Sequence, residues 1–508
     1  MSLCKNKNIV LLIISTIVLI GCDNKDESSR VFRINEGSSV FVKHLELYNI
    51  DISDINHIEY TILPQPDATA MPIYVHFSVQ SLLDKEYYNS ETRSLILPVF
   101  GLYSDYLNQV NLNISYKGGL SVKEIIEIQT EAFVDPNGIY DRMLVNKAPV
   151  LSDPTSIPSF SYFYIRSSLA APVVVDIDGK IRWFNTGSSS FASIFIDDKF
   201  VTGTGSDILH YNLDGAVESY ALRNAHIVDA HFHHNFDQGP LGILIELDGI
   251  VNGIEKIESY MAEITPEGEV LKEWDFGEIF ADYMLTFGEL QVDIDNFVRD
   301  SFDWCHQNAT AYNSADDSLI ISCRENFIFK IDYETGALQW VLGDETKHWF
   351  VNYPSLQAIS LQLTSGKHPI GQHAVSITND GNILLFNNGT RSLRNPEGTP
   401  SGISHPTSTP SKYRIDEENL MAEEMWYYEG DLVSDFCSSV YQDKSGDMLI
   451  SYARASRGEK AIVRIIDTNN NEDSVGDENI LLDIELMPNS ECDISWNAIP
   501  IPFESIEY

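Results

Sequence analysis

The residues of this chain that are suited to chemistry are mainly its histidines. Nine of the 13 histidines lie between His226 and His405. Three clusters at residues 229–235, 303–325 and 371–389 combine them with polar and acidic side chains. An imidazole can act as a nucleophile, a general acid or a general base near neutral pH. The clusters are therefore the first places to look for a catalytic site.

The second cluster allows a geometric prediction. Residues 313–317 are expected to form the turn of a β-hairpin centred near position 314. This register places His306 opposite Ser322 and brings Arg324 diagonal to His306. Because side chains alternate faces along a strand, Asn308 is expected on the same face as these three residues. A histidine and an arginine that converge in this way make an anion site, which a one-residue slip in register would undo.

Two cysteines lie on the other face of the same hairpin. The predicted register places Cys305 directly opposite Cys323. They could form a cross-strand disulfide or simply pack as small apolar groups. We expect packing, because directly opposed strand pairs often strain the bridge.

The histidines also have ordinary interpretations. His231, His233 and His234 could hold zinc, but His234 alternates to the opposite face of its strand and no acidic or cysteine ligand is obvious nearby. We therefore predict no metal site. His306 and His373 could each be an interior histidine with satisfied hydrogen bonds, which is the more common state of a lone histidine.

The elements that hold these clusters belong to a large acidic protein. The chain has 508 residues, too many for one ordinary core unless a repeat architecture spreads the core out. Hydrophobic residues make up 43% of the chain, a usual share for a globular protein. The formal net charge of −42 disfavours binding to nucleic acid or to anionic lipid surfaces.

Residues 1–22 have the features of an export signal. A positively charged start precedes an apolar run at residues 9–20, which as a helix is too short to span a bilayer. The run ends in Leu-Ile-Gly-Cys, which resembles a bacterial lipobox with Cys22 as the lipidated residue; an ordinary signal peptide is the alternative. Residues 23–30 are polar and are expected to form a tether. We predict an extracytoplasmic lipoprotein, anchored in the periplasm or at the outer-membrane surface.

Two β-rich regions follow this tether. Residues 31–150 alternate apolar and polar side chains between turn signals, which predicts a small N-terminal β-sandwich. Residues 146–158 hold three prolines and are expected to be the linker. Between residues 159 and 508, a turn followed by a β-rich run with aromatic residues recurs six times, which favours an all-β, six-bladed β-propeller. A helical insertion is expected at residues 279–298.

The six recurring turns lie at residues 176–179, 213–215, 266–268, 333–336, 416–419 and 467–471.

Three stretches of the propeller region resemble the bacterial arylsulfate sulfotransferase family. The strongest resemblance runs from residue 303 to residue 343, with a histidine and an arginine at matching places. Residues 372–389 resemble the next motif of the family, and residues 175–183 resemble its first blade. The likeness covers about residues 160–460, and it implies a six-bladed propeller preceded by a β-sandwich.

The resemblance implies roles for particular residues. His373 matches the transiently sulfated nucleophile of the family, and His306 and Arg324 match the pair that binds the sulfuryl group. One histidine of the first cluster matches the remaining active-site histidine; we choose His234, with His233 second. His233 and Asn308 complete the set as substrate-binding candidates.

The resemblance also implies a reaction. A sulfuryl group passes from an aryl sulfate donor to a phenolic acceptor by a ping-pong mechanism, without a cofactor and without a nucleotide sulfate donor. Asn235 stands where an acidic residue usually follows the family's histidine, which bears on the choice of His234. Asn387 stands where the family often has Asp, and residues 435–441 match poorly, which bears on acceptor preference. The alternatives are a hydrolase, in which water takes the sulfuryl group, and a non-catalytic propeller that binds a ligand or partner.

Overall fold

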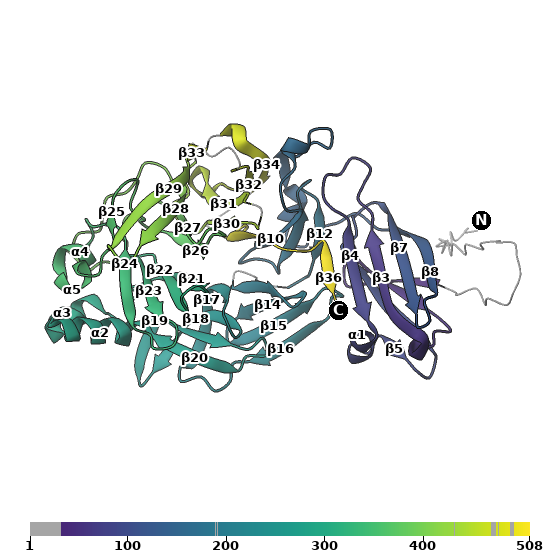
Figure 1. Cartoon of the computed structure of the whole chain (residues 1–508), viewed down its shortest axis with the longest axis horizontal. Helices are drawn as coiled ribbons and strands as arrows, with labels where there is room; N and C mark the ends of the chain where they lie inside the picture. Colours follow the sequence, from purple (N-terminus) through teal and green to yellow (C-terminus); the bar gives the residue numbers. More distant parts are fainter. Residues whose placement is uncertain are drawn as a thin grey trace, which may run out of the picture.

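The computed structural model contains two β-rich domains that lie side by side (Figure 1). It describes residues 32–187, 189, 192–430, 432–444, 446–468, 474–475, 477–487 and 492–508. The predicted export signal, Cys22 and the tether lie outside these residues. Within the described parts of the chain, no helix is long and apolar enough to cross a membrane.

The N-terminal domain is a sandwich of two sheets. In β3 (Ile55–Ile62) the buried residues Ile58, Tyr60 and Ile62 alternate with more exposed neighbours, as expected for a strand with one face in a core. One sheet has the order β1-β2-β6-β5 and the other the order β36-β4-β3-β7-β8. The remaining strands are β1 (Phe32–Glu36), β2 (Val42–Leu47), β4 (Ile73–Ser78), β5 (Tyr88–Asn89), β6 (Ser94–Phe100), β7 (Leu107–Tyr116), β8 (Ser121–Gln129) and β36 (Ser505–Glu507).

The second domain consists of six sheets of at least four strands each, which confirms the predicted six-bladed propeller. The recurring turns at 176–179, 213–215, 266–268, 333–336 and 416–419 each join the third and fourth strands of a blade, counted from the centre. The turn at 467–471 occupies the same place in the sixth blade but falls partly outside the described residues. This position explains the repeat, because every blade needs the same outer hairpin.

The blades, each given from its inner strand outwards, have the following bounds. The first has β35 (Asn497–Pro500), β10 (Tyr162–Arg166), β11 (Val173–Asp176) and β12 (Ile181–Phe184); the second has β13 (Ser193–Ile196), β14 (Lys199–Thr204), β15 (Asp207–Asn212) and β16 (Val217–Ala221). The third has β17 (Val228–Gln238), β18 (Ile243–Val251), β19 (Ile254–Ile264) and β20 (Val270–Asp275); the fourth has β21 (Gln307–Asn313), β22 (Ser318–Cys323), β23 (Ile328–Asp332) and β24 (Leu338–Leu342). The fifth has β26 (His373–Ile377), β27 (Ile383–Asn387), β28 (Thr409–Asp416) and β29 (Met421–Tyr428), with β25 (Gln362–Leu363) and β33 (Ser474–Val475) on its edge; the sixth has β30 (Ser439–Gln442), β31 (Met448–Ala455), β32 (Lys460–Ile466), β34 (Ile480–Leu486) and β9 (Leu144–Lys147).

Two strands cross the predicted domain boundaries. β9 falls within the predicted sandwich region, residues 31–150, yet it pairs with β34 at the outer edge of the sixth blade. β36 falls within the predicted propeller region, residues 159–508, yet it pairs with β4 in the sandwich. Each strand supplies hydrogen-bond partners to a sheet edge that would otherwise be open, which is why the chain exchanges them between domains.

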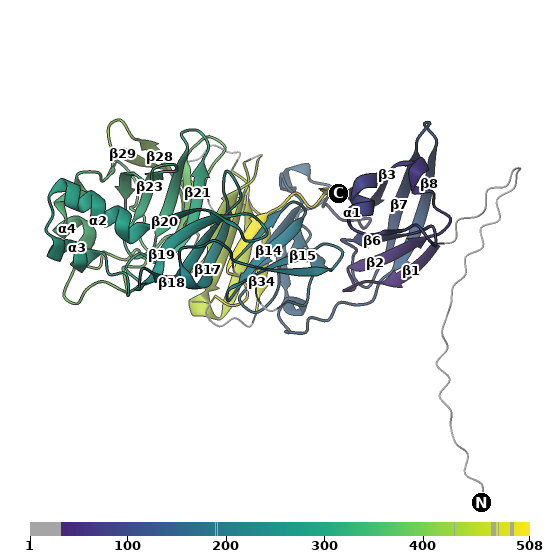
Figure 2. The same ribbon diagram turned by 90° about the horizontal axis from the view of Figure 1, so that it is seen from below.

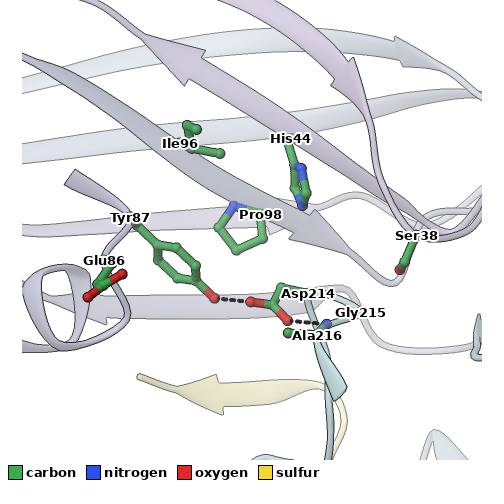
Figure 3. A pocket seen from close by; sticks show the side chains of 9 residues that line it. All are labelled: Ser38, His44, Glu86, Tyr87, Ile96, Pro98, Asp214, Gly215 and Ala216. Atoms are coloured by element: carbon green, nitrogen blue, oxygen red, sulfur yellow. Dashed lines mark hydrogen bonds between the residues drawn. The ribbon is translucent and has the colours of Figure 1, made fainter. Parts of the chain in front are cut away.

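Polar side chains hold the two domains together. The carboxylate of Asp178 in the first blade accepts hydrogen bonds from the backbone N–H groups of Thr69 and Ala70. The buried guanidinium of Arg182 donates to the Gly101 carbonyl at 2.8 Å. A cavity beside this interface is lined by residues of both domains, and in it Tyr87 donates a hydrogen bond to Asp214 (Figure 3).

The predicted helical insertion at 279–298 consists of two helices. They are α2 (Phe276–Phe287), which begins where Asp275 accepts a hydrogen bond from the Glu278 N–H, and α3 (Gln291–Phe297). Gly288 has φ +108°, a left-handed conformation that ends α2. These helices lie with α4 (His348–Asn352) and α5 (Pro354–Gln357) at the side of the propeller away from the sandwich (Figures 1 and 2). Helix α1 (Val79–Asp84) belongs to the sandwich.

Candidate active site

The predicted site residues come from three neighbouring blades. His234 lies within β17, His306 directly precedes β21, Arg324 directly follows β22, and His373 begins β26. The inner strand β21 packs against both β17 and β26, so the ends that carry these residues are neighbours. The rings of His234 and His306 lie 4.9 Å apart. The structure therefore brings together side chains that are far apart in the sequence.

Each of the three inner strands has a bulge at its histidine. The register shifts between His233 and Phe236, between Gln307 and Ala309, and between His373 and Ser376. His234 and His306 have φ values of +46° and +55°, which side chains other than glycine rarely adopt. Such conformations cost about 1–3 kcal/mol each, and outside turns they cluster at functional sites. The bulges aim the imidazoles away from the regular alternation of the strands.

The register predicted for the second cluster is wrong. The turn lies later than position 314, because Asn313 pairs with Ser318 and Ala309 pairs with Ser322. His306 therefore lies opposite Arg324, not opposite Ser322, and its carbonyl accepts a hydrogen bond from the Arg324 N–H at 3.1 Å. The bulge between Gln307 and Ala309 shifts the pairing back by one residue, and the histidine and the arginine are closer neighbours than predicted.

The expectation that Cys305 and Cys323 only pack together is also wrong, since they form a disulfide. Cys323 pairs in the ladder with Gln307, so the two cysteines are not directly opposed and the geometric objection does not apply. A second disulfide joins Cys437 to Cys492, with Cα atoms 6.4 Å apart.

His373 is held as a neutral imidazole with a defined tautomer. Its Nδ1 lies 2.7 Å from Asn388 Oδ1 and 3.2 Å from the Gly371 carbonyl oxygen, both of which are acceptors. Asn388 is oriented by its own Nδ2, which donates to the carbonyls of Ser434 and Cys437. Nδ1 must therefore carry the hydrogen, which leaves a lone pair on Nε2. Burial, with the nearby positive charges of Arg324 and His306, lowers the pKa of His373 to about 3.

His306 is held in the opposite protonation state. Its Nδ1 lies 2.6 Å from a carboxylate oxygen of Glu258 and 2.7 Å from one of Asp303. Burial alone would lower the pKa of His306, but the two carboxylates outweigh it and raise this pKa to about 10. His306 is thus an imidazolium at neutral pH. Sequence reasoning missed Glu258, because this residue comes from β19 and no local motif marks it.

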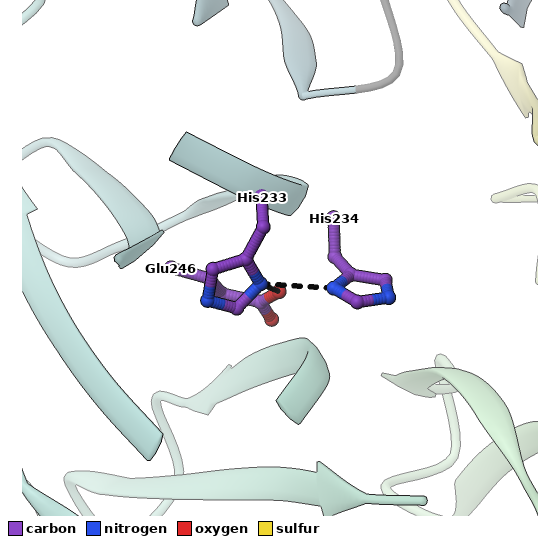
Figure 4. Close-up of side chains that lie close together, drawn as sticks. All are labelled: His233, His234 and Glu246. Atoms are coloured by element: carbon purple, nitrogen blue, oxygen red, sulfur yellow. Dashed lines mark hydrogen bonds and ion pairs between the residues drawn. The ribbon is translucent and has the colours of Figure 1, made fainter. Parts of the chain in front are cut away.

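His234 is the histidine of the first cluster that faces His306. Its ring also lies 5.3 Å from that of Trp496, while burial holds its pKa well below the usual value. His233 lies behind it, and the two Nδ1 atoms are 2.9 Å apart (Figure 4). His231, the third histidine of this strand, is exposed.

Arg324 presents unused hydrogen-bond donors to the site. It is 2% exposed, and its Nη1 pairs with Glu325. Its Nε and Nη2 have no hydrogen-bond partner among the described residues. The guanidinium lies 4.8 Å from the centre of the Phe436 ring. A buried donor without a partner costs about 1–3 kcal/mol, so this arrangement is suited to an anionic ligand that would fill the vacant positions.

Asn308 connects the site to the strand of the nucleophile candidate. Its Nδ2 donates to the Gln372 carbonyl at 2.8 Å, and Gln372 in turn donates to the Cys323 carbonyl at 3.0 Å. Asn308 thereby fixes the backbone next to His373, while its own Oδ1 has no partner in the described part of the chain. Asn387 accepts from the Ile370 N–H and donates to the His368 carbonyl, so it holds the loop that leads into His373.

The fold brings two carboxylates, those of Glu246 and Glu258, next to the histidines, which the sequence did not indicate. Ligand atoms of His233, His234 and Glu246 lie within 4.8 Å of one another, as do those of His234, Glu258 and His306. The reason given for expecting no metal, that no acidic residue lies near the histidines, is therefore wrong. In the second group, Glu258 and His306 form an ion pair with each other.

Both domains match models of known protein families. A family model described as Arylsulfotransferase (ASST) matches residues 147–496, and one described as Arylsulfotransferase Ig-like domain matches residues 47–131. Arylsulfate sulfotransferase AssT of Lelliottia amnigena is 22% identical over 451 residues, which cover 68% of this chain and 72% of that protein. Arylsulfate sulfotransferase AssT of Escherichia coli O6:H1 is 26% identical over 159 residues, which cover 27% of this chain and 25% of that protein.

Proposed function

Because the chain belongs to the arylsulfotransferase family and is an aryl-sulfate sulfotransferase, we propose that it transfers the sulfuryl group through His373. The observation that carries this proposal is the tautomer of His373. Hydrogen bonding of Nδ1 to Asn388 and a pKa of about 3 leave Nε2 as an unprotonated, buried nitrogen. Such a nitrogen is a nucleophile that needs no prior deprotonation.

In the first half of the reaction, Nε2 of His373 attacks the sulfur of the aryl sulfate. A nitrogen–sulfur bond forms as the bond between sulfur and the aryl oxygen breaks. The departing phenolate takes a proton from the His306 imidazolium, which Glu258 and Asp303 have kept charged. The products are a phenol and a sulfated His373.

In the second half, an acceptor phenol gives its proton to the now neutral His306. Its oxygen attacks the same sulfur, the nitrogen–sulfur bond breaks, and His373 returns to its starting state. The donor phenol leaves before the acceptor enters, which makes the kinetics ping-pong. Charge gathers on oxygen atoms in both steps, so positioned donors contribute much of the rate.

Arg324 and His234 are the proposed donors to those oxygens. The Nε and Nη2 of Arg324, which have no partner among the residues that the structure describes, would bind sulfuryl oxygens, and the charge on both partners would strengthen these bonds. His234, neutral and in ring contact with His306, would donate through Nε2. Asn308 would position the backbone beside His373 through its bond to Gln372. His233 would position the ring of His234.

The test of the proposed function is a colour assay. The purified chain is mixed with a chromogenic aryl sulfate, with and without phenol. Colour release that depends on phenol, with sulfate appearing on the phenol, is the expected result. Release indifferent to phenol would instead make the protein a hydrolase, and no release from several donors would favour a propeller that only binds ligands.

We further propose that the protein is exported and anchored through lipid on Cys22, as the sequence at residues 19–22 indicates. Two disulfides support an oxidising compartment. In detergent phase separation, the wild-type protein and a Cys4→Ala control are expected in the detergent phase and Cys22→Ala in the aqueous phase. Equal partitioning of all three would contradict the anchor.

A further inference from the structure

His233 and His234 form a buried cluster with Glu246, a carboxylate that the transfer mechanism does not use. His233 and His234 face each other through their Nδ1 atoms, 2.9 Å apart, and Glu246 on β18 lies beside them (Figure 4). A carboxylate oxygen of Glu246 is 3.7 Å from His233 Nδ1. All three side chains are buried. The three ligand atoms are thus gathered inside the protein, not on its surface.

The carboxylate of Glu246 lacks adequate partners. Its Oε1 has no hydrogen bond within the described residues, and its Oε2 accepts only a long one, 3.4 Å, from the Asn235 N–H. Glu246 is 1% exposed, so water cannot compensate it freely. Ionisation of a buried carboxylate without partners is costly, and either protonation or a bound cation removes that cost.

We propose that His233, His234 and Glu246 bind one divalent transition-metal ion of the Zn²⁺ class. Two imidazole nitrogens and one carboxylate oxygen are a usual ligand set for zinc, whereas Ca²⁺ and Mg²⁺ prefer oxygen ligands alone. Two Nδ1 atoms at 2.9 Å can form a hydrogen bond only if one of them carries a hydrogen. Metal binding releases that hydrogen to solvent as a proton and uses both lone pairs.

A further carboxylate completes the arrangement around the ligands. Asp248 Oδ1 lies 3.5 Å from His233 Nε2, the ring nitrogen that is not a ligand. Metal-binding histidines commonly present their second nitrogen to a carboxylate in this way, which fixes the tautomer. The ion would also fix His234, since a neutral imidazole bound through Nδ1 carries its hydrogen on Nε2. The ion is thus a structural addition to the site that takes no part in the bond changes proposed above.

The test measures metal content, so it does not depend on activity. The full chain, without a polyhistidine tag, is stripped with a chelator, dialysed against Zn²⁺ and freed of excess metal. Elemental analysis is expected to give about one zinc per wild-type chain. Replacement of zinc by Co²⁺ is expected to give visible absorption bands typical of a site with few ligands and low symmetry.

Three variants distinguish this site from surface binding. Glu246→Gln and His233→Gln are expected to weaken zinc binding at least about tenfold. His231→Gln, which changes an exposed histidine on the same strand, is expected to bind zinc like the wild type. The proposal is overturned if the wild type retains no zinc, or if Glu246→Gln, a change of nearly equal volume, binds it as well as the wild type. Loss of binding in His231→Gln alone would assign the metal to the surface instead.

Discussion

At the scale of single residues, the site gives two chemically identical side chains different protonation states. Burial and two positive neighbours keep His373 neutral, while two carboxylates keep His306 charged. One imidazole is thereby available as a base or nucleophile and the other as an acid at the same pH. Arg324, Glu258 and Asp303 supply charges that produce this division, and Asn388 fixes the tautomer of His373.

The pH dependence of enzyme sulfation follows from the pKa of His373. This pKa lies near 3 in the folded protein, so His373 remains neutral as the pH falls from 7 to 5. An imidazole with the usual pKa of about 6.5 would be only about 3% neutral at pH 5, and its rate would fall about 25-fold from pH 7. We expect the single-turnover rate of phenol release to change less than about threefold over this range. A fall that follows a pKa near 6.5 would show that His373 is not the nucleophile or is not held neutral.

Arg324→Lys tests the proposed binding of sulfuryl oxygens. Lysine keeps the charge but loses the planar pair of donors at Nε and Nη2. We expect kcat/KM for an aryl sulfate to fall about 10²–10³-fold, as for loss of one positioned donor in other enzymes. Arg391→Lys, at an exposed arginine, is the matched control and is expected to retain wild-type kinetics. Equal activity in the two variants would remove Arg324 from the mechanism.

At the scale of elements, loops that are held covalently support the inner strands. The carbonyl of Cys437 accepts a hydrogen bond from Asn388, and Cys492 precedes β35. The bridge between them closes a loop of 55 residues, and the loss of such a bridge typically costs about 2–4 kcal/mol. The double variant Cys437→Ala and Cys492→Ala should therefore unfold at lower urea concentration than the oxidised wild type. The same midpoint for the double variant and the oxidised wild type would contradict a stabilising role of this disulfide.

The sequence predicted elements better than it predicted their exact pairing. The repeated turns indicated six blades because each blade repeats the same outer hairpin. The hairpin register failed because the turn lies later than position 314, with Asn313 paired to Ser318, and because a bulge between Gln307 and Ala309 shifts the pairing again. The disulfide of Cys305 was missed for the same reason, since the objection to it assumed a register in which Cys305 lies directly opposite Cys323.

The residues of the candidate site were likewise predicted only in part from the sequence. His306, Arg324 and His373 could be found because each lies in a continuous motif of the family. Glu258 and Trp496 could not, because Glu258 reaches the site from β19, Trp496 from the residue before β35, and their local sequence carries no signal. Asn388 was within reach, since it stands in a polar pair directly after the buried strand β27.

At the scale of the whole molecule, the last residues of the chain tie the two domains together. β35 completes the first blade of the propeller, and β36 then joins the sandwich. Ile506 is fully buried there, and the ring of Tyr508 stacks on that of Phe77 at 5.2 Å. The chain thus ends inside the domain with which its described part begins.

Deletion of residues 505–508 tests this connection. We expect a lower melting temperature, because β36 and its buried side chains are lost, but unchanged specific activity at 25 °C, because the site lies in the propeller. Ser505→Ala, which keeps the strand, is the control and should melt like the wild type. An unaltered melting temperature after deletion would show that β36 adds nothing to stability.

The most direct test of the account is to look for the sulfated histidine itself. The wild-type chain is mixed with an aryl sulfate labelled at sulfur, quenched in alkali within one turnover and digested for peptide mapping. We predict label on the peptide that contains His373, release of this label on addition of phenol, and no label in His373→Ala. Turnover of the aryl sulfate without label on His373, or full activity of His373→Ala, would contradict the mechanism.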